Sequence, residues 1–281
     1  MASQYFASSA FTRTIVGHAS QCGLPVSDLL TRAGISEQLL NLPSRKIPAH
    51  LVERLWQECE NAGATRYFGC GLINSMATST LQGLNILLDS AATLRGSLEC
   101  VARYSTFVTN YVHLHLDQEG SCAHLHIRPT QDQPHFFGLD AATLSLVRNM
   151  SRRVGLTVDA LFSEVSLSPR QASGDLLNSW NVRVGHGEYT CLQIPLELLD
   201  LPLLGANEFL HQSLSRQWHS SDQKDSPGKR LHLARVWLTS GEESVERISE
   251  RLGYQRSSSF IRAFQKQYGI TPKQFRLSTH K

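Results

Sequence analysis

Two stretches in the first half of the chain place apolar residues at the spacing of one helix face. They predict helices over residues 48–63 and 88–108. The inward-facing residues are Leu51, Leu55, Trp56 and Cys59 in the first helix and Leu94, Leu98, Val101 and Tyr104 in the second. Core packing accounts for both stripes, and no cofactor is predicted.

Between residues 111 and 127 the period changes to two, which predicts a β-hairpin. A turn at Glu119-Gly120 would set residue 112 opposite 127, 114 opposite 125 and 116 opposite 123, so that the apolar side chains share one face. On the other face, the same register would set His113 opposite His126 and His115 opposite His124.

Four imidazoles on one sheet face are able to bind a transition metal or to respond to acid. Side chains that project in parallel from a sheet seldom converge into a tetrahedral cage. A histidine-rich polar face is therefore the preferred interpretation, and whether the face binds a metal is left open.

The pattern continues with a helix over residues 142–155 and a strand over 164–168. Residues 180–207 predict a short strand, a turn at Gly185-His186-Gly187 and another strand. Residues 1–208 are therefore expected to form one α/β or α+β domain.

A polar segment, 209–229, follows and is expected to be a linker or the frayed end of a helix, since it contains Ser226-Pro227-Gly228. Residues 230–281 then predict a small all-α module. Its first helix carries a stripe of Leu231, Ala234 and Leu238 and ends near Gly241. Its second is capped by Ser244, buries Val245, Ile248 and Leu252, and closes on Gly253.

The third helix of this module has two dissimilar sides. One side carries Phe260, Ile261, Phe264 and Tyr268, and the helix ends at Gly269 before Pro272 opens a closing helix. A helix, a tight turn and a helix with short polar residues at its start form the helix-turn-helix layout, whose second helix enters the major groove. A plain helical hairpin with a polar surface is the alternative.

The opposite side of that helix, which presents Ser258, Ser259, Arg262, Gln265 and Lys266, and the residues at its start supply the predicted DNA contacts. They are Arg256, Ser257, Ser258, Ser259, Arg262, Gln265 and Lys266. Small serines allow the backbone to approach closely, Arg262 suits a guanine edge, and Arg256 and Lys266 suit phosphates.

The distribution of charge supports this interpretation. The net charge of +3 divides into +7 from Lys229 to the end and −4 before it, and residues 251–281 hold seven basic residues and no acidic one. Repulsion within such a run is tolerated most easily beside a polyanion. The alternative is a basic tail with no partner.

Other classes of protein are disfavoured. The six cysteines are scattered, no apolar run has the length of a membrane span, and the start lacks the layout of a secretory signal. A cytoplasmic protein is expected. No nucleophile–base motif, phosphate-cradling glycine loop or metal-ligand spacing points to an enzyme.

The segment ERISERLGYQRSSSFIRAFQKQYGITPKQFR, 246–276, resembles the second helix-turn-helix unit of AraC-family transcription regulators. The shared positions are Ile248, Leu252, Gly253, Tyr254, Ser258, Phe260, Arg262, Phe264, Gly269, Pro272 and Arg276, whereas Ser249 stands where alanine is usual. TLRGSLECVARYSTFV, FSEVSLSPRQ, WNVRVGHGEYTCLQIPLELLDLPL and GANEFL are similar to the effector-binding and dimerisation domain of the arabinose-binding-type subgroup.

The resemblance implies a DNA-binding transcription regulator, often an activator, that dimerises and senses a small molecule. Double-stranded DNA, an effector, a second copy of the chain and RNA polymerase are then the expected partners. Tyr104, Tyr111 and the hairpin histidines are candidate effector contacts, although a structural role is preferred for each.

Family members carry two helix-turn-helix units, and this sequence lacks room for the first. Only fourteen residues, 215–228, separate the end of the sensor pattern from the linking helix KRLHLARVWL. Leu233, Val236 and Trp237 are expected to expose an apolar side that the missing unit would cover. The alternative function is a dimerising or effector-binding protein that modulates full-length relatives and binds little DNA itself.

Overall fold

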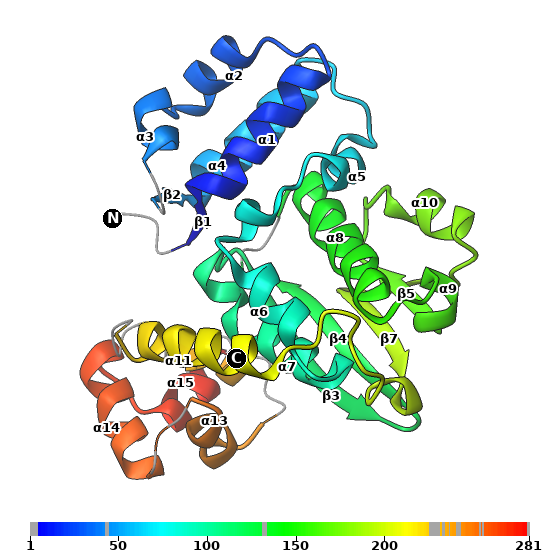
Figure 1. Cartoon of the computed structure of the whole chain (residues 1–281). Coiled ribbons are helices and arrows are strands. Elements are labelled where there is room, and N and C mark those ends of the chain that lie inside the picture. The colour runs from blue at the N-terminus through cyan, green and yellow to red at the C-terminus, as the bar shows by residue number, and fades with distance from the viewer. Residues whose placement is uncertain are drawn as a thin grey trace. The chain divides into compact units, whose positions relative to one another are not determined.

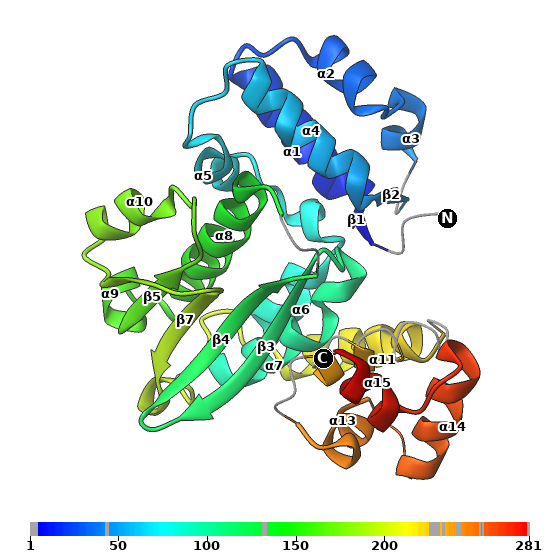
Figure 2. The same cartoon turned by 180° about the vertical axis from the view of Figure 1, so that it is seen from behind.

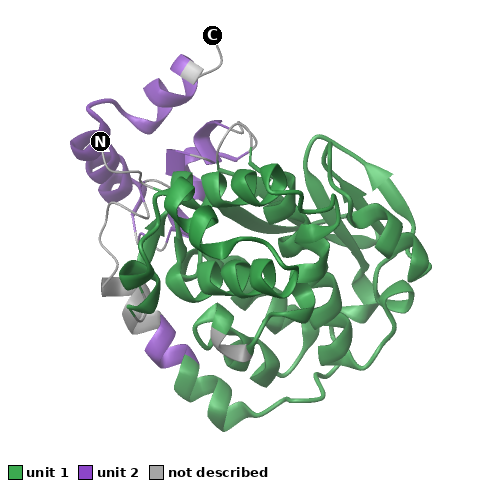
Figure 3. Cartoon of the chain, turned by 90° about the horizontal axis from the view of Figure 1, so that it is seen from above, with its two compact units in different colours: residues 1–214 green, residues 215–281 purple. Residues whose placement is uncertain are grey.

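The computed structural model describes residues 5–42, 45–130, 134–224, 231, 234–235, 237–239, 243–252, 254 and 256–279. The chain divides into two compact units, Met1–Leu214 and Ser215–Lys281 (Figure 3). The predictions for Ser226-Pro227-Gly228, Leu233, Val236, Gly241 and Gly253 lie outside the described residues.

The first unit opens with a group of helices and a short two-stranded sheet that lies at one end of α1 and α4 (Figure 1). The elements are β1 (Phe6–Ser8), α1 (Ser9–Gln21), α2 (Val26–Ala33), α3 (Glu37–Asn41), β2 (Lys46–Pro48) and α4 (Ala49–Asn61). The helix predicted over 48–63 is confirmed as α4, and Leu55, Trp56 and Cys59 are at most 1% exposed. Trp56 packs edge-on against Phe68 and Phe137, which ties this layer to the next elements.

Short helices lead from this layer to the main sheet. They are α5 (Phe68–Gly71), η1 (Leu72–Asn74), η2 (Thr78–Leu81), α6 (Leu84–Ser90), α7 (Leu94–Tyr104) and η3 (Ser105–Phe107). The single helix predicted over 88–108 is wrong. Thr93 is extended and its hydroxyl accepts a hydrogen bond from the Gly96 N–H, so it caps α7 as a new helix. The four inward residues predicted for α7 are all buried.

The main sheet has the order β3-β4-β7-β5-β6. Its strands are β3 (Val112–Glu119), β4 (Cys122–Pro129), β5 (Glu164–Leu167), β6 (Val184–His186) and β7 (Thr190–Pro195). Only β5 and β6 are parallel, so of the two fold classes predicted the sheet fits α+β. Figure 2 shows β3 and β4 in front of α6 and α7, and α7 contacts β3.

The hairpin was predicted on the correct residues but in the wrong register. A two-residue turn at Gly120-Ser121 sets Glu119 opposite Cys122, which moves every pair by two residues. Gly120 has φ +60°, the left-handed conformation that such a turn needs. Because the shift is even, the apolar face keeps its residues. His115 now lies opposite His126, and His113 lies opposite Arg128.

The remaining elements of the first unit are α8 (Phe136–Val154), α9 (Val158–Leu161), α10 (Ser173–Ser179) and η4 (Leu196–Leu198). The helix predicted over 142–155 begins earlier, because the His135 side chain accepts a hydrogen bond from the Phe137 N–H at its N-terminus. The turn predicted at Gly185-His186-Gly187 is wrong, since Gly185 and His186 belong to β6. That strand pairs with β5 rather than with β7.

The second unit is helical where it is described. α11 (Glu208–Lys224) occupies most of the segment predicted to be a linker, and it starts in the first unit. Residues 231, 234–235 and 237–239 are helical. α13 (Val245–Arg251), α14 (Ser257–Tyr268) and α15 (Pro272–Thr279) complete the unit. The domain boundaries at 208 and 229 stay predictions. Within the described residues, no helix combines the length and hydrophobicity needed to cross a membrane.

Candidate nucleic-acid interface

α13 begins and packs as its sequence predicts. The Ser244 hydroxyl accepts a hydrogen bond from the Arg247 N–H at 3.2 Å, which caps the helix. Ile248 and Leu252 are buried in the core of the unit, and Val245 packs against it. Ser249, where the family usually has alanine, is 1% exposed. Its hydroxyl has no hydrogen-bond partner among the described residues.

α14 is anchored by its aromatic side. Phe260 and Phe264 are fully buried, with ring centroids 5.8 Å apart, and they join Leu231, Ala234 and Leu238 in one core cluster. Tyr268 continues the row, 4.7 Å from Phe264. Residues four apart lie on one helix face, so these three rings fix the rotation of the helix about its axis.

The end of α14 and the start of α15 are also determined locally. Gly269 adopts φ +79° and its N–H donates to the Gln265 carbonyl, which terminates α14. Thr271 and Gln274 then form a reciprocal cap. The Gln274 side chain accepts from the Thr271 N–H, and the Thr271 hydroxyl accepts from the Gln274 N–H. Pro272 occupies the first turn of α15, as predicted.

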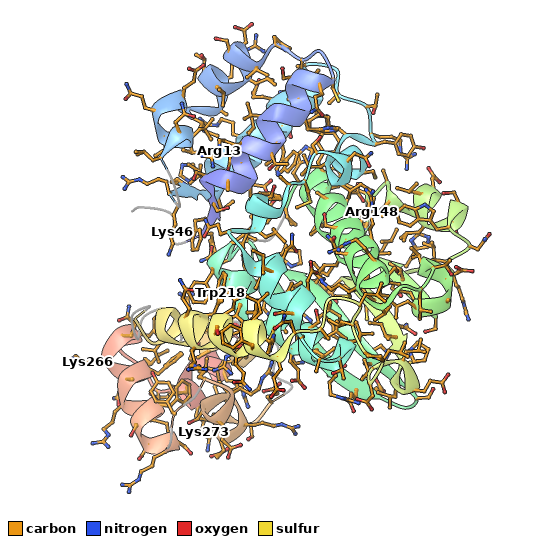
Figure 4. The ribbon with its side chains drawn as sticks, viewed as in Figure 1. Arg13, Lys46, Arg148, Trp218, Lys266 and Lys273 are labelled. Carbon is orange, nitrogen blue, oxygen red and sulfur yellow. The ribbon has the colours of Figure 1, made fainter. Side chains whose placement is uncertain are left out.

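Five of the predicted DNA-contacting residues lie on the side of α14 opposite its buried face, namely Ser258, Ser259, Arg262, Gln265 and Lys266. Arg256 precedes the helix, and Ser257 begins it on the side of Phe264. Six of the predicted residues are exposed, namely Arg256, Ser258, Ser259, Arg262, Gln265 and Lys266, and Ser257 is half-buried. Lys266 extends outward from the helix (Figure 4). Arg262 lies along the helix, where its Nε donates to the Ser258 carbonyl at 3.4 Å.

The first turn of α14 is itself a feature of this surface. Arg256 precedes the helix in an extended conformation, and its side chain makes no capping hydrogen bond. The free N–H groups at a helix start attract anions because of their number and the helix dipole. Ser257, Ser258 and Ser259 add hydroxyls at this end, so the arrangement suits a phosphate group.

Two basic residues of the carboxylate-free run are used inside the unit instead. Arg251 pairs with the Glu243 carboxylate and lies 4.2 Å from the Trp237 ring centroid. Arg276 donates to the Glu243 backbone carbonyl. The charge pattern did not indicate a role for Glu243, because this residue precedes the carboxylate-free run, which begins at Arg251. Both arginines therefore hold helices together.

The apolar side expected on the linking helix is only partly tested. Leu233 and Val236 lie outside the described residues. Trp237 is half-buried, packs against the core of the unit and is covered by Arg251. Trp237 is therefore partly covered by a neighbouring helix and partly exposed.

In the first unit, the histidine face of the sheet surrounds a carboxylate. Asp117 lies 3.1 Å from His126 Nε2, 3.5 Å from His115 Nε2 and 3.6 Å from His124 Nδ1. Burial lowers the pKa of His126 and outweighs the attraction of Asp117. Across the described stretches, no group of three or more His, Cys, Asp or Glu side chains has a geometry that could hold a metal ion.

Comparisons with known proteins agree with both units. Residues 23–203 match the arabinose-binding domain at the N-terminus of AraC transcription regulators, and residues 228–278 match a helix-turn-helix domain. The first match covers more than half of the chain, so the chain belongs to the AraC family of transcription regulators. A single helix-turn-helix unit agrees with the one found in the sequence.

Two individual proteins are similar to parts of the chain. The HTH-type transcriptional regulator YtdP of Bacillus subtilis (strain 168) is 45% identical over 47 residues, which is 17% of this chain and 6% of that protein. The chain thus corresponds to a small fraction of that relative. The crystal structure of the transcriptional regulator CdpR from Pseudomonas aeruginosa aligns with a TM-score of 0.49 and 16% identity, over 89% of this chain and 96% of that one.

Proposed function

We propose that this protein regulates transcription by binding duplex DNA through α14 and by responding to a small molecule bound in its first unit. The observation that carries the proposal is the division of α14 into two sides. Phe260 and Phe264 are fully buried, whereas Arg262 and Lys266 are exposed on the other side. A helix held in this way presents its polar side to a major groove.

Each exposed group has a distinct role in this proposal. Arg262 donates two hydrogen bonds to a guanine edge, which selects sequence. Arg256 and Lys266 contact phosphates on either side, and the serines at the start of α14 let the backbone approach the duplex. Arg251 and Arg276 serve the fold, since both are bound to Glu243.

One reading helix offers few contacts, so a homodimer is part of the proposal. A second copy doubles the number of base and phosphate contacts, and the tethered second contact strengthens the first. We further propose a cytoplasmic location and activation through contact with RNA polymerase, both of which follow from the family. If binding to DNA lacks sequence selectivity, the alternative applies: a dimerising or effector-binding protein that modulates full-length relatives.

The test is a gel-shift titration of the full chain at two salt concentrations, on a duplex selected from a random library. Arg262→Ala should weaken binding to the selected duplex by about 1–3 kcal/mol and reduce the preference of the protein for this duplex over random DNA. Lys266→Ala should weaken binding to the selected duplex and to random DNA equally. The slope of log affinity against log salt concentration should become shallower by about one, because one phosphate contact is lost.

Arg54→Ala is the matched control, because it removes one exposed arginine from α4 in the first unit. It should leave the titrations unchanged. A full chain that shows no preference for any selected duplex at low salt, yet forms mixed dimers with a two-unit relative, would replace the proposal with the alternative. Equal losses of affinity for the selected duplex in Arg262→Ala and Arg54→Ala would show that α14 does not read the DNA sequence.

A further inference from the structure

The first unit contains a partly open apolar cavity that the sequence did not predict. Its volume is about 110 Å³, and its walls come from α4, α6, α7, α8 and β3. Most of the lining is aliphatic, with Val52, Leu84, Leu88 and Val101 among the buried residues. An engineered apolar cavity of roughly 150 Å³ stays dry and binds benzene. The present cavity is therefore of a size for a small organic molecule.

Two hydroxyl groups in the cavity wall have no hydrogen-bond partner. They belong to Ser105 and Tyr111, and each of these residues is 8% exposed. Neither oxygen finds a donor or acceptor anywhere in the part of the chain that the structure describes. Leaving a buried hydroxyl unpaired costs about 1–3 kcal/mol. Such a cost at two sites in one cavity is explained if a bound molecule supplies the partner.

A third polar group, the Trp56 indole N–H, lies near the Tyr111 hydroxyl in the cavity wall. Gly138 of α8 also lines the cavity, and a Cβ placed on it would lie 3.6 Å from the Tyr111 hydroxyl and 3.3 Å from Trp56 Nε1. The Tyr111 phenol and the Trp56 indole N–H therefore lie near each other beside Gly138 in the cavity wall. A hydroxyl or carbonyl oxygen of a ligand could meet both groups there, since the indole donates and the phenol both donates and accepts.

The residues that line the cavity disfavour an ionic ligand. Arg153 is the one lining residue with a formal charge among those described. Its Nε donates to Asp89 at 2.6 Å and its second nitrogen to Asn85 at 3.1 Å, so its charge is already balanced. Burial lowers the pKa of Arg153, and Asp89 opposes this effect. A carboxylate ligand would enter an apolar space without a free cation, which is unfavourable.

We propose that this cavity is the effector site and that it takes a small, neutral, mostly apolar molecule with one hydrogen-bonding oxygen. The name effector rests on the regulatory function proposed above, whereas the binding itself does not. The oxygen of the ligand meets Tyr111 and Trp56 at the inner wall, and Ser105 offers a second hydroxyl to it. The aliphatic wall holds the rest of the molecule.

Phenol and toluene test the proposal as a pair of nearly equal size, and benzoate, which is larger and anionic, tests the exclusion of a carboxylate. Their affinities for the full chain are measured by ligand-observed NMR titration, without DNA, so that the result is separate from the gel-shift experiment. Phenol and toluene should bind, and benzoate should bind at least about tenfold more weakly than phenol. In Tyr111→Phe the affinity for phenol should fall about three- to tenfold while that for toluene stays the same.

Two comparisons guard against a mere loss of folding. Removing an unpaired hydroxyl should leave the unfolding temperature of Tyr111→Phe without ligand unchanged or higher. Tyr104→Phe alters a buried tyrosine of the same unit that does not line the cavity, and it should bind phenol like the wild type. Absence of binding by both phenol and toluene, tighter binding of benzoate, or equal losses of phenol and toluene in Tyr111→Phe would each overturn the proposal.

Discussion

The two units are held together by contacts of different range. In the second unit, the rings that anchor α14 are four residues apart, and its caps involve residues three apart. In the first unit, the fully buried Asp140 accepts hydrogen bonds from the backbone of Ala172 and Ser173, more than thirty residues away. In the second unit, contacts between residues close in sequence hold α14 in place. Distant contacts enclose an interior that holds a cavity.

The largest expected effect is a loss of stability in the second unit, whose core is small. Phe264→Ala removes a fully buried ring that contacts Phe260, Tyr268 and Phe275, and it should destabilise this unit by about 3–5 kcal/mol. Hydrogen exchange followed by mass spectrometry should show fast exchange throughout residues 243–279, with the first unit unchanged. Exposed Gln265→Ala is the control on the same helix. An equal rise in hydrogen-exchange rate in both units would mean that they unfold together.

A pair of substitutions compares ion pairs in the two units. The Arg153 side chain is 3% exposed beside Asp89, whereas Arg251 is 29% exposed beside Glu243. Asp89→Asn leaves a buried guanidinium without its carboxylate and should lower the free energy of unfolding by about 3 kcal/mol. Glu243→Gln should cost less than about 1 kcal/mol. It keeps the backbone carbonyl that binds Arg276.

Urea denaturation of the full chain, followed by unit-resolved hydrogen exchange, measures both values. The difference between them should exceed about 2 kcal/mol, because partial exposure lets water solvate Arg251 in the variant. Equal costs in the two variants would show that burial of Arg153 does not set the strength of its pair.

The smallest effect depends on pH. Burial raises the pKa of Glu53 to about 7, although the His135 N–H opposes the shift. A carboxyl with a raised pKa adds stability below its unfolded pKa of 4.5, and this stability is lost as the pH rises through 7. Glu53→Gln mimics the protonated form. The variant should match the wild type near pH 4 and exceed it at pH 8 by at most about 3 kcal/mol.

Thermal unfolding of both proteins between pH 4 and pH 8 checks this prediction. Burial lowers the pKa of His18, His126 and His135, so all three groups make both proteins less stable as the pH falls below 6.5. Their effect cancels when the wild type is subtracted from the variant. A difference that is constant with pH would mean that Glu53 is already ionised in the folded protein.

The sequence determined the second unit almost completely where the structure describes it. The cap at Ser244, the buried Phe260 and Phe264, the stop at Gly269 and the polar outer side of α14 all follow from residues a few positions apart. Such features obey the helical repeat, which can be counted along the chain. The same periodicity found α4 and the faces of the hairpin in the first unit.

Only the tertiary structure decided the register of the hairpin and the pairing of β6 with β5. It alone brought Trp56, Ser105, Tyr111 and Gly138 to one cavity and set Glu243 beside Arg251 and Arg276. A register that slips by two residues keeps the alternation of apolar and polar positions, so the pattern cannot distinguish the two. A cavity arises from walls that are distant along the chain, and their spacing depends on how all of them pack.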